Sequence, residues 1–388
     1  MVNQPIYLDF AAATPVDEAA IKVMRPFLSE QFYNPSAIYQ PARRVRAVVE
    51  EARGQVASVL GSKDQEIIFT AGGTEANNLA ITGVMERFPD GHMIVSAIEH
   101  ESVLEPAYEF DYSVAKVSNK GITDVEDVKS LVKSNTVLIS VMYANNEIGT
   151  IQPIKALSEL VNAVRTQRKS SGNKLPLYLH TDACQAANYL DLQVTRLGVD
   201  MMTLNGGKIY GVKQSGCLYK HKSVTLKPLI NGGGQEQGLR SGTENVTALL
   251  SFATMLQKVS ADRKQQGDRQ KLLINKLYAT LSQKLPDIFL NGHPDKRLPN
   301  NLNICIPHLD GERLVLELDE AGVLAATGSA CTASNDEPSH VLLAIGLSEE
   351  DASSSLRLTI GRDTTEEQVE KAANIIVDCV QKMQKLVQ

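Results

Sequence analysis

Short apolar runs alternate with helical patterns through the first two thirds of the chain, and this alternation limits the fold more than any other feature. Five runs are typical of buried strands, at residues 66–70, 92–96, 137–143, 177–180 and 201–204. Stretches with helical spacing of apolar residues lie at 16–28, 42–60, 75–87 and 154–168. Such alternation predicts an α/β domain with a largely parallel sheet covered on both faces. Ligands of such sheets bind at the carboxyl ends of the strands.

The pattern changes near residue 244. It indicates a long helix over 248–283 with a break near Gly267, a strand at 302–306 and a helix at 312–321. The last helix follows Thr364-Thr-Glu-Glu-Gln368, which resembles a capping box. We therefore expect a smaller α+β domain. The predicted division is a large cofactor-binding domain, 15–255, and a small domain made of 1–14 and 256–388.

Composition excludes several classes of function. The net charge is −6 and basic residues are interspersed with acidic ones, so nucleic acid is not an expected ligand. The N-terminal residues do not resemble a signal peptide and the apolar runs are too short to span a bilayer, so we expect a cytoplasmic protein without a membrane segment. The five cysteines include no Cys-x-x-Cys pair, which predicts reduced thiols, no disulfide framework and no metal site.

A phosphate seat is suggested by Ala71-Gly-Gly-Thr-Glu75, which follows a predicted strand and opens a predicted helix. Glycines allow close backbone approach to an anion, and the first turn of a helix presents unpaired N–H groups to it. Thr74 adds a hydroxyl donor. The same residues would equally suit a strand-to-helix turn that needs glycine.

Two further segments fit a pyridoxal cofactor. Asp182 follows the strand 177–180 and can keep the ring nitrogen protonated, while Gln185 can donate to the phenolic oxygen. Lys208 follows Asn205-Gly-Gly at the end of the next strand and suits the Schiff-base role. Taken alone, such an aspartate is more often a helix cap, and such a lysine a solvated charge.

Three more side chains are candidates. His100 can stack on a planar ring or move protons, although a lone histidine is more often a surface residue. Arg357 can clamp a carboxylate, with a structural ion pair as the alternative. Cys331 lies in a loop rich in small residues, 327–335, which we expect to be flexible and its thiol accessible. The other cysteines lie in or near apolar runs, Cys184 inside the cofactor segment.

Together these segments resemble the cysteine desulfurase family, in its form with a long catalytic loop, over nearly the whole chain. The resemblance rests on Tyr7-Leu-Asp9, Asn34-Pro-Ser36, Glu99-His100, Asn145-Asn-Glu-Ile-Gly149, Arg240-Ser-Gly-Thr243, Leu298-Pro-Asn300, Gly328-Ser-Ala-Cys-Thr332 and Ser354-Ser-Leu-Arg357. It implies a fold-type-I pyridoxal 5'-phosphate homodimer that converts L-cysteine to L-alanine. The sulfur would be held as a persulfide and passed to an acceptor protein, either an iron-sulfur scaffold or a relay protein of tRNA thiolation.

The resemblance also implies a role for each matching residue. Lys208 would carry the cofactor, His100 would stack on its ring, Asp182 would pair with the ring nitrogen, and Asn146 and Gln185 would flank it. Gly73, Thr74 and Asn205 would hold the phosphate, joined by Thr243 of the second subunit. Arg357, helped by Asn34, would bind the substrate carboxylate, and Cys331 would be the nucleophile.

The sequence departs from the family pattern before the lysine. The family has serine and histidine, both bonding the phosphate, where this chain has Asn205 and Gly207. Loss of one charge-assisted hydrogen bond costs about 1.5–3 kcal/mol, so weaker cofactor retention is expected. Two alternatives therefore stay open: a degenerate paralogue that acts as a binding or regulatory partner, or another pyridoxal-phosphate lyase such as a selenocysteine lyase.

Overall fold

The computed structural model describes residues 5–328 and 338–387. Its centre is a seven-stranded mixed sheet in the order β2-β8-β7-β6-β5-β3-β4. The strands are β2 (Ile67–Thr70), β3 (His92–Ser96), β4 (Asp111–Ala115), β5 (Thr136–Ser140), β6 (Tyr178–Asp182), β7 (Met201–Asn205) and β8 (Gly216–Lys220). Four neighbouring pairs are parallel, and only β8 pairs antiparallel with both of its neighbours.

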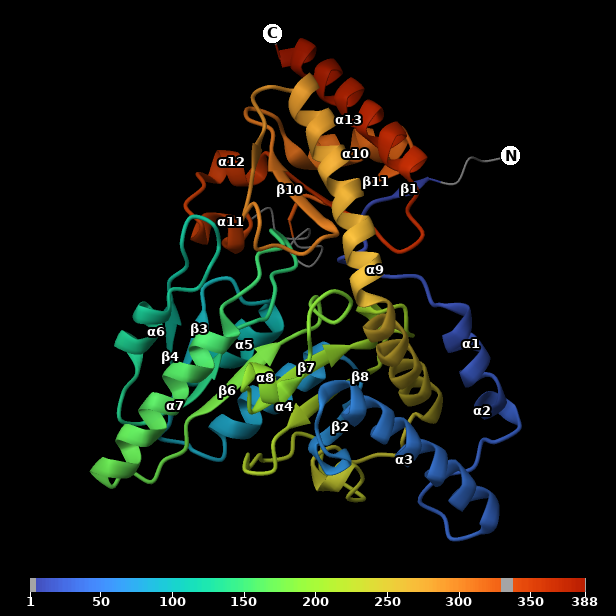
Figure 1. The fold of residues 1–388 in the computed structure, drawn as a ribbon, viewed down its shortest axis with the longest axis vertical. Coiled ribbons are helices and arrows are strands. Elements are labelled where there is room, and N and C mark those ends of the chain that lie inside the picture. The colour runs from blue at the N-terminus through green and yellow to red at the C-terminus, as the bar shows by residue number, and fades with distance from the viewer. Residues whose placement is uncertain (1–4, 329–337, 388) are drawn as a thin grey trace.

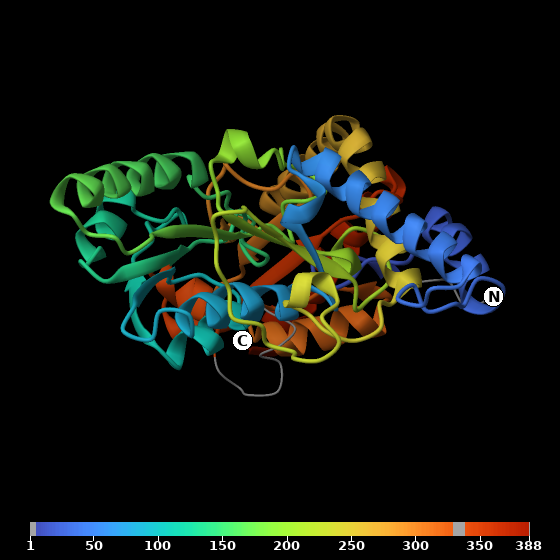
Figure 2. The same cartoon turned by 90° about the horizontal axis from the view of Figure 1, so that it is seen from below.

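Helices cover both faces of this sheet (Figure 2). Alternate residues of each strand point to opposite faces: Ile67 and Phe69 pack into one apolar cluster, and Ile68 packs into another. The first face packs against α3 (Gln40–Leu60), α7 (Ile154–Ser171) and the first half of α9 (Val246–Lys284). The second face packs against α4 (Gly73–Met85) and α5 (Glu101–Tyr108). The expected α/β architecture is thus confirmed.

A third apolar cluster lies beyond the sheet, at the top of Figure 1. It contains an antiparallel sheet of β9 (Phe289–Leu290), β10 (Asn301–Cys305) and β12 (Ser355–Thr359), and a parallel pair of β1 (Ile6–Tyr7) with β11 (Val323–Leu324). It also contains α10 (Gly311–Glu320), α13 (Glu366–Val387) and the second half of α9. This is the smaller α+β unit. The remaining helices are α1 (Glu18–Met24), α2 (Pro26–Ser29), α6 (Val125–Leu131), α8 (Val194–Leu197), α11 (His340–Ala344) and α12 (Glu349–Ser353).

Several predicted elements differ from the structure. The break expected near Gly267 is wrong, because α9 runs unbroken for 39 residues. The helix expected over 16–28 is two helices, and Pro26 begins the second because proline fits the first turn of a helix. The strand expected over 137–143 is shorter, because β5 ends at Ser140. Strands β4 and β8 were not predicted at all.

The predicted capping box is confirmed. Thr365 and Gln368 form the reciprocal capping bonds before α13, with distances of 3.1 Å and 2.9 Å. In the part of the chain that the structure describes, no helix has the length and apolarity needed to cross a bilayer.

Candidate active site

The carboxyl ends of the parallel strands meet at one edge of the large sheet, where a cavity of about 140 Å³ opens. Because β2, β3, β5, β6 and β7 run in the same direction, the segments that follow them reach this edge together. Nine of the predicted site residues line the cavity: Gly73, Thr74, His100, Asn146, Asp182, Gln185, Asn205, Lys208 and Arg357.

The first turn of α4 forms one wall of the cavity. Gly72 precedes the helix with φ of 126°, in a region that strongly favours glycine. A β-carbon on Gly73 would lie 2.8 Å from Cys184 Sγ, so glycine is needed there for close packing. The unpaired N–H groups of this turn and the positive end of the helix dipole favour an anion. This geometry fits a phosphate.

Asp182 ends β6 and is 8% exposed. Its Oδ1 accepts a hydrogen bond from the Cys184 backbone N–H at 2.8 Å, and its Oδ2 accepts from Asn77 Nδ2 at 2.7 Å. Two donors therefore hold the carboxylate in one orientation. Burial raises the pKa of the neighbouring Cys184 thiol well above its usual range, and the Asp182 charge raises it further, so this thiol stays protonated.

Lys208 follows β7 at the end of a short 3-10 turn, Gly206–Lys208. Its Nζ donates to the carbonyl oxygens of Ala11 at 2.9 Å and Ala12 at 2.6 Å. Gln185 Nε2 donates to the same Ala11 oxygen at 2.9 Å. The N-terminal segment therefore lies against the predicted cofactor lysine, a contact that the sequence did not indicate.

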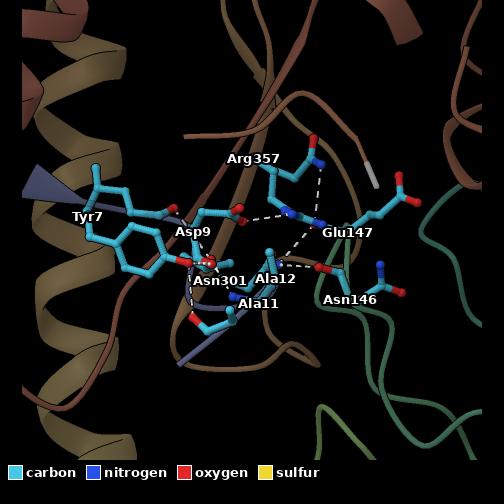
Figure 3. A network of polar contacts seen from close by, with 12 residues as sticks. Tyr7, Asp9, Ala11, Ala12, Asn146, Glu147, Asn301 and Arg357 are labelled. Carbon is cyan, nitrogen blue, oxygen red and sulfur yellow. Dashed lines mark hydrogen bonds and ion pairs between the residues drawn. The ribbon is translucent and has the colours of Figure 1, made fainter. Parts of the chain in front are cut away.

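Arg357 reaches the cavity from β12 of the smaller unit and is 2% exposed. Its Nη2 pairs with Asp9 Oδ1 at 2.8 Å, as Figure 3 shows. Its Nε has no hydrogen-bond partner among the described residues although it is buried. A buried guanidinium with an unused donor is suited to bind a carboxylate.

The two residues that replace the family's serine and histidine contact each other. Asn205 Oδ1 accepts from the Gly207 backbone N–H at 2.9 Å. Its Nδ2 lies 3.4 Å from the position of a β-carbon on Gly73, next to the first turn of α4. Asn205 therefore keeps one donor beside the anion seat, while Gly207 offers no side chain.

Two predicted residues are not brought to the cavity by this chain. Asn34 and Thr243 are exposed and are not among its lining residues. Asn34 instead accepts a hydrogen bond from the Ser36 backbone N–H at 2.9 Å. Cys331 lies outside the described residues.

Sequence reasoning also missed cavity residues. Asn77, Ser102, Met142 and Cys184 line the site. Asn77 lies one helical turn after Gly73, so the i, i+4 spacing of α4 was the signal that could have placed it. Among the residues that the structure describes, no group of three or more histidine, cysteine, aspartate or glutamate side chains forms a metal site.

The donor set fits pyridoxal phosphate. An anion seat, an oriented carboxylate, a lysine and a guanidinium share one cavity, which matches the phosphate, the cationic ring, the aldehyde and the amino-acid carboxylate in turn. A chain with only a structural turn at α4 would not need these groups to converge.

Comparisons with known proteins agree with this geometry. The family model for class-V aminotransferases matches residues 6–372. The cysteine desulfurase IscS 1 of Archaeoglobus fulgidus is 38% identical over 387 residues, covering 98% of each chain. A solved NifS-like protein is 29% identical with a TM-score of 0.89, covering 98% of this chain and 100% of that one. A solved SspA in complex with cysteine is 33% identical with a TM-score of 0.77, covering 91% of this chain and 98% of that one. The chain therefore belongs to the cysteine desulfurase family of pyridoxal-phosphate enzymes, within the class-V aminotransferases.

Proposed function

We propose that this cysteine desulfurase processes L-cysteine in the cavity at the carboxyl edge of the sheet and holds the sulfur on Cys331. The observation that carries the proposal is the convergence of Lys208, Asp182 and Arg357 on one cavity of about 140 Å³. Asp182 ends β6, Lys208 ends the 3-10 turn that follows β7, and Arg357 lies in β12 of the smaller unit.

The cofactor roles follow from the contacts in the cavity. Lys208 would hold the cofactor covalently, and Asp182 would pair with the ring nitrogen. Gly73, Thr74 and Asn205 would donate to the phosphate, and His100, Asn146 and Gln185 would surround the ring. Bound pyridoxal phosphate supplies an electron sink for the substrate's α-carbon.

The roles proposed in substrate binding and sulfur transfer rest on the positive charge of Arg357 and on the thiol of Cys331. Arg357 would bind the cysteine carboxylate through the donors that Asp9 does not use. Asn34, which is exposed and does not line the cavity of its own chain, would assist Arg357. The Cys331 thiolate would attack the substrate sulfur and form an S–S bond. The C–S bond then breaks, its electrons pass to carbon, and protonation of that carbon gives alanine. The product sulfur remains on Cys331 as a persulfide.

A homodimer completes the proposed site. Thr243 is exposed and lies outside the cavity of its own chain, as expected of a residue that would serve the partner subunit. Large apolar side chains near Asn34 are also exposed, with Leu28 at 66%, Phe32 at 68% and Ile38 at 90%. A second copy covering this region would bury them.

The sulfur acceptor would be an iron-sulfur scaffold or a thiolation relay protein, and the enzyme would act in the cytoplasm. We also propose the division into a large domain, 15–255, and a small domain of 1–14 and 256–388. The separate apolar clusters around the large sheet and around β10 support it.

Sulfur release from L-cysteine tests the proposal. The wild-type protein should produce alanine and sulfide in the presence of a reductant, and borohydride reduction should place the pyridoxyl label on Lys208. Cys331→Ser should still bind cofactor and cysteine but release almost no sulfide. Cys379→Ser, on α13, is the matched control and should retain turnover. A label on another lysine, or normal turnover by Cys331→Ser, would contradict the assignment.

A further inference from the structure

Asn77 is a fully buried amide on α4 that lines the cavity. Its Nδ2 donates one hydrogen to Asp182 Oδ2 at 2.7 Å and the other to Ser102 Oγ at 2.8 Å. Both donors of the amide are therefore used. Through them Asn77 joins β6 to the start of α5.

The orientation of this amide is fixed by charge. If the amide were turned over, its Oδ1 would face the Asp182 carboxylate at hydrogen-bond distance, and two acceptors would repel each other. In the orientation shown, Oδ1 is buried without a partner among the described residues. Burying an acceptor without a hydrogen bond is unfavourable for folding. We therefore attribute the presence of an amide here to the two hydrogen bonds that its Nδ2 donates.

His100 is held at the other end of the same chain of contacts. Its Nδ1 accepts from the Ser102 backbone N–H at 3.0 Å and lies 2.9 Å from Ser102 Oγ. A backbone N–H can only donate, so Nδ1 carries no proton. Ser102 Oγ already accepts from Asn77, which directs its own hydrogen to Nδ1. The proton of the neutral imidazole is therefore on Nε2.

We propose that Asn77 and Ser102 are positioning residues that keep His100 as the Nε2–H tautomer and couple its ring orientation to Asp182. Nε2 is then the ring nitrogen that can exchange a proton with a molecule in the cavity. This inference rests on the proposed function of the cavity, because it assigns His100 a single working nitrogen there. It also explains why an amide, rather than an apolar residue, occupies the buried face of α4.

The tautomer can be measured directly. We would label the purified protein with ¹⁵N-histidine, assign the His100 ring signals with His100→Asn, and measure the protonation of Nδ1 and Nε2. The wild type should show protonated Nε2 and unprotonated Nδ1. Ser102→Ala removes the hydroxyl donor, and Asn77→Asp turns a donor into an acceptor that draws the Ser102 hydrogen away. Loss of one hydrogen bond should lower the Nε2–H to Nδ1–H ratio by about two- to tenfold.

Matched controls separate this effect from general perturbation. Asn374→Asp adds the same charge on α13, and Ser282→Ala removes a helix hydroxyl whose hydrogen bond, at 2.7 Å, is to the Tyr278 backbone oxygen. Neither should change the His100 signals. His92, whose ring nitrogens contact Thr136 and Ser113, serves as an internal reference in every spectrum.

Kinetics then separate positioning from binding. With cofactor loaded, Ser102→Ala and Asn77→Asp should lower kcat and leave KM for cysteine near the wild-type value, since Arg357 is untouched. A wild-type His100 protonated on Nδ1, or a tautomer ratio unchanged in both variants, would overturn the inference. If Asn77→Asp does not fold, the tautomer ratio of Ser102→Ala alone tests the inference. If wild-type protein releases no sulfur but the tautomer shifts as expected, the positioning role stands and the proposed function fails.

Discussion

At the scale of single residues, some hydrogen-bond donors in the cavity already have a partner in the protein, and others are left for a ligand. Arg357 donates a hydrogen bond from Nη2 to Asp9, while its Nε has no hydrogen-bond partner among the described residues. Asp9 neutralises a charge that would otherwise be buried alone, while Tyr7 Oη donates to the Asp9 backbone oxygen at 2.8 Å (Figure 3). The guanidinium is thus oriented before a substrate arrives.

Replacement of Arg357 by lysine should weaken cysteine binding. Lysine keeps the positive charge, but its ammonium group lacks the planar set of donors with which a guanidinium can bind Asp9 and a substrate carboxylate at once. We therefore expect KM for cysteine to rise about ten- to a hundredfold. The absorbance of the bound cofactor should not change. Steady-state kinetics check this, with Arg313→Lys on the exposed side of α10 as the control. An unchanged KM would show that the carboxylate binds elsewhere.

Cofactor retention should depend on Asn205 and Gly207. A β-carbon on Gly207 would lie 3.4 Å from Asn205 Oδ1 and 3.6 Å from Lys213 Cγ, which is ordinary contact. The double variant Asn205→Ser with Gly207→His therefore has room for the imidazole at its base. It should slow cofactor loss on dialysis about tenfold or more, by restoring phosphate donors. Each single variant is the control for the pair. Equal or faster loss from the double variant would mean that the chain holds the phosphate by another route.

At the scale of elements, α9 joins the apolar cluster on one face of the large sheet to the apolar cluster of the smaller unit. Its first half packs with the large sheet through residues such as Phe252 and Leu256, and its second half packs around Leu277 and Leu281. Gly267 lies between these halves without interrupting the helix. A glycine in a helix interior costs only about 1 kcal/mol relative to alanine, which the packing at both ends exceeds. This is why the predicted break did not form.

Gly267→Ala should therefore stabilise the protein. Among the described residues, a β-carbon there would meet Pro299 Cγ at 3.7 Å, an ordinary van der Waals contact, so the substitution fits. We expect the free energy of unfolding to rise by about 0.5–1 kcal/mol, measured by urea denaturation. Gly61→Ala is the opposite control, because Gly61 has φ of 65° and its β-carbon would lie 2.2 Å from Gln193 Oε1. A loss of stability in Gly267→Ala would indicate a need for flexibility within α9.

At the scale of the whole molecule, the sheet and the smaller unit are held together by charged contacts besides α9. Asp17, before α1, pairs with Lys258 of α9 at 2.8 Å and with Arg362, just after β12, at 2.7 Å. Arg362 also lies over the Tyr210 ring at 4.4 Å, and Tyr210 is two residues after Lys208. The position of Lys208, the proposed cofactor lysine, is thus tied to the strand that carries Arg357.

The stability of the whole chain should fall at mildly acidic pH because of His180. This residue lies in β6 between Ser140 and Thr203, and burial lowers its pKa to about 4. An unfolded histidine takes up a proton near pH 6.5, whereas the folded one stays neutral to about pH 4. The unfolded state therefore binds more protons as the pH falls, and about 2 kcal/mol of stability is lost between pH 7 and pH 5.

Urea unfolding at pH 7 and pH 5 checks this dependence. His180→Gln should be less stable at pH 7 but should show a smaller difference between the two pH values than the wild type. His221→Gln, at a partly exposed position, should keep the wild-type difference. The same difference in all three proteins would assign the acid sensitivity to other groups.

The sequence by itself determined the α/β architecture and most of the candidate cavity. Periodicity located the buried strands and helices, because burial of apolar residues follows local spacing. Parallel strands share a carboxyl edge, so segments after β2, β3, β6 and β7 could be expected to meet. Nine predicted residues do line one cavity. The roles of these residues stay predictions.

Only the tertiary structure decided the remaining contacts. The Asp9 partner of Arg357 is 348 residues away, and Asn77 meets Asp182 across 105 residues. Such pairs leave no periodic signal, because their partners depend on how whole elements pack. Strands β4 and β8 and the unbroken α9 were decided in the same way. Local propensity is worth about 1 kcal/mol per residue, and the packing of complete faces outweighs it.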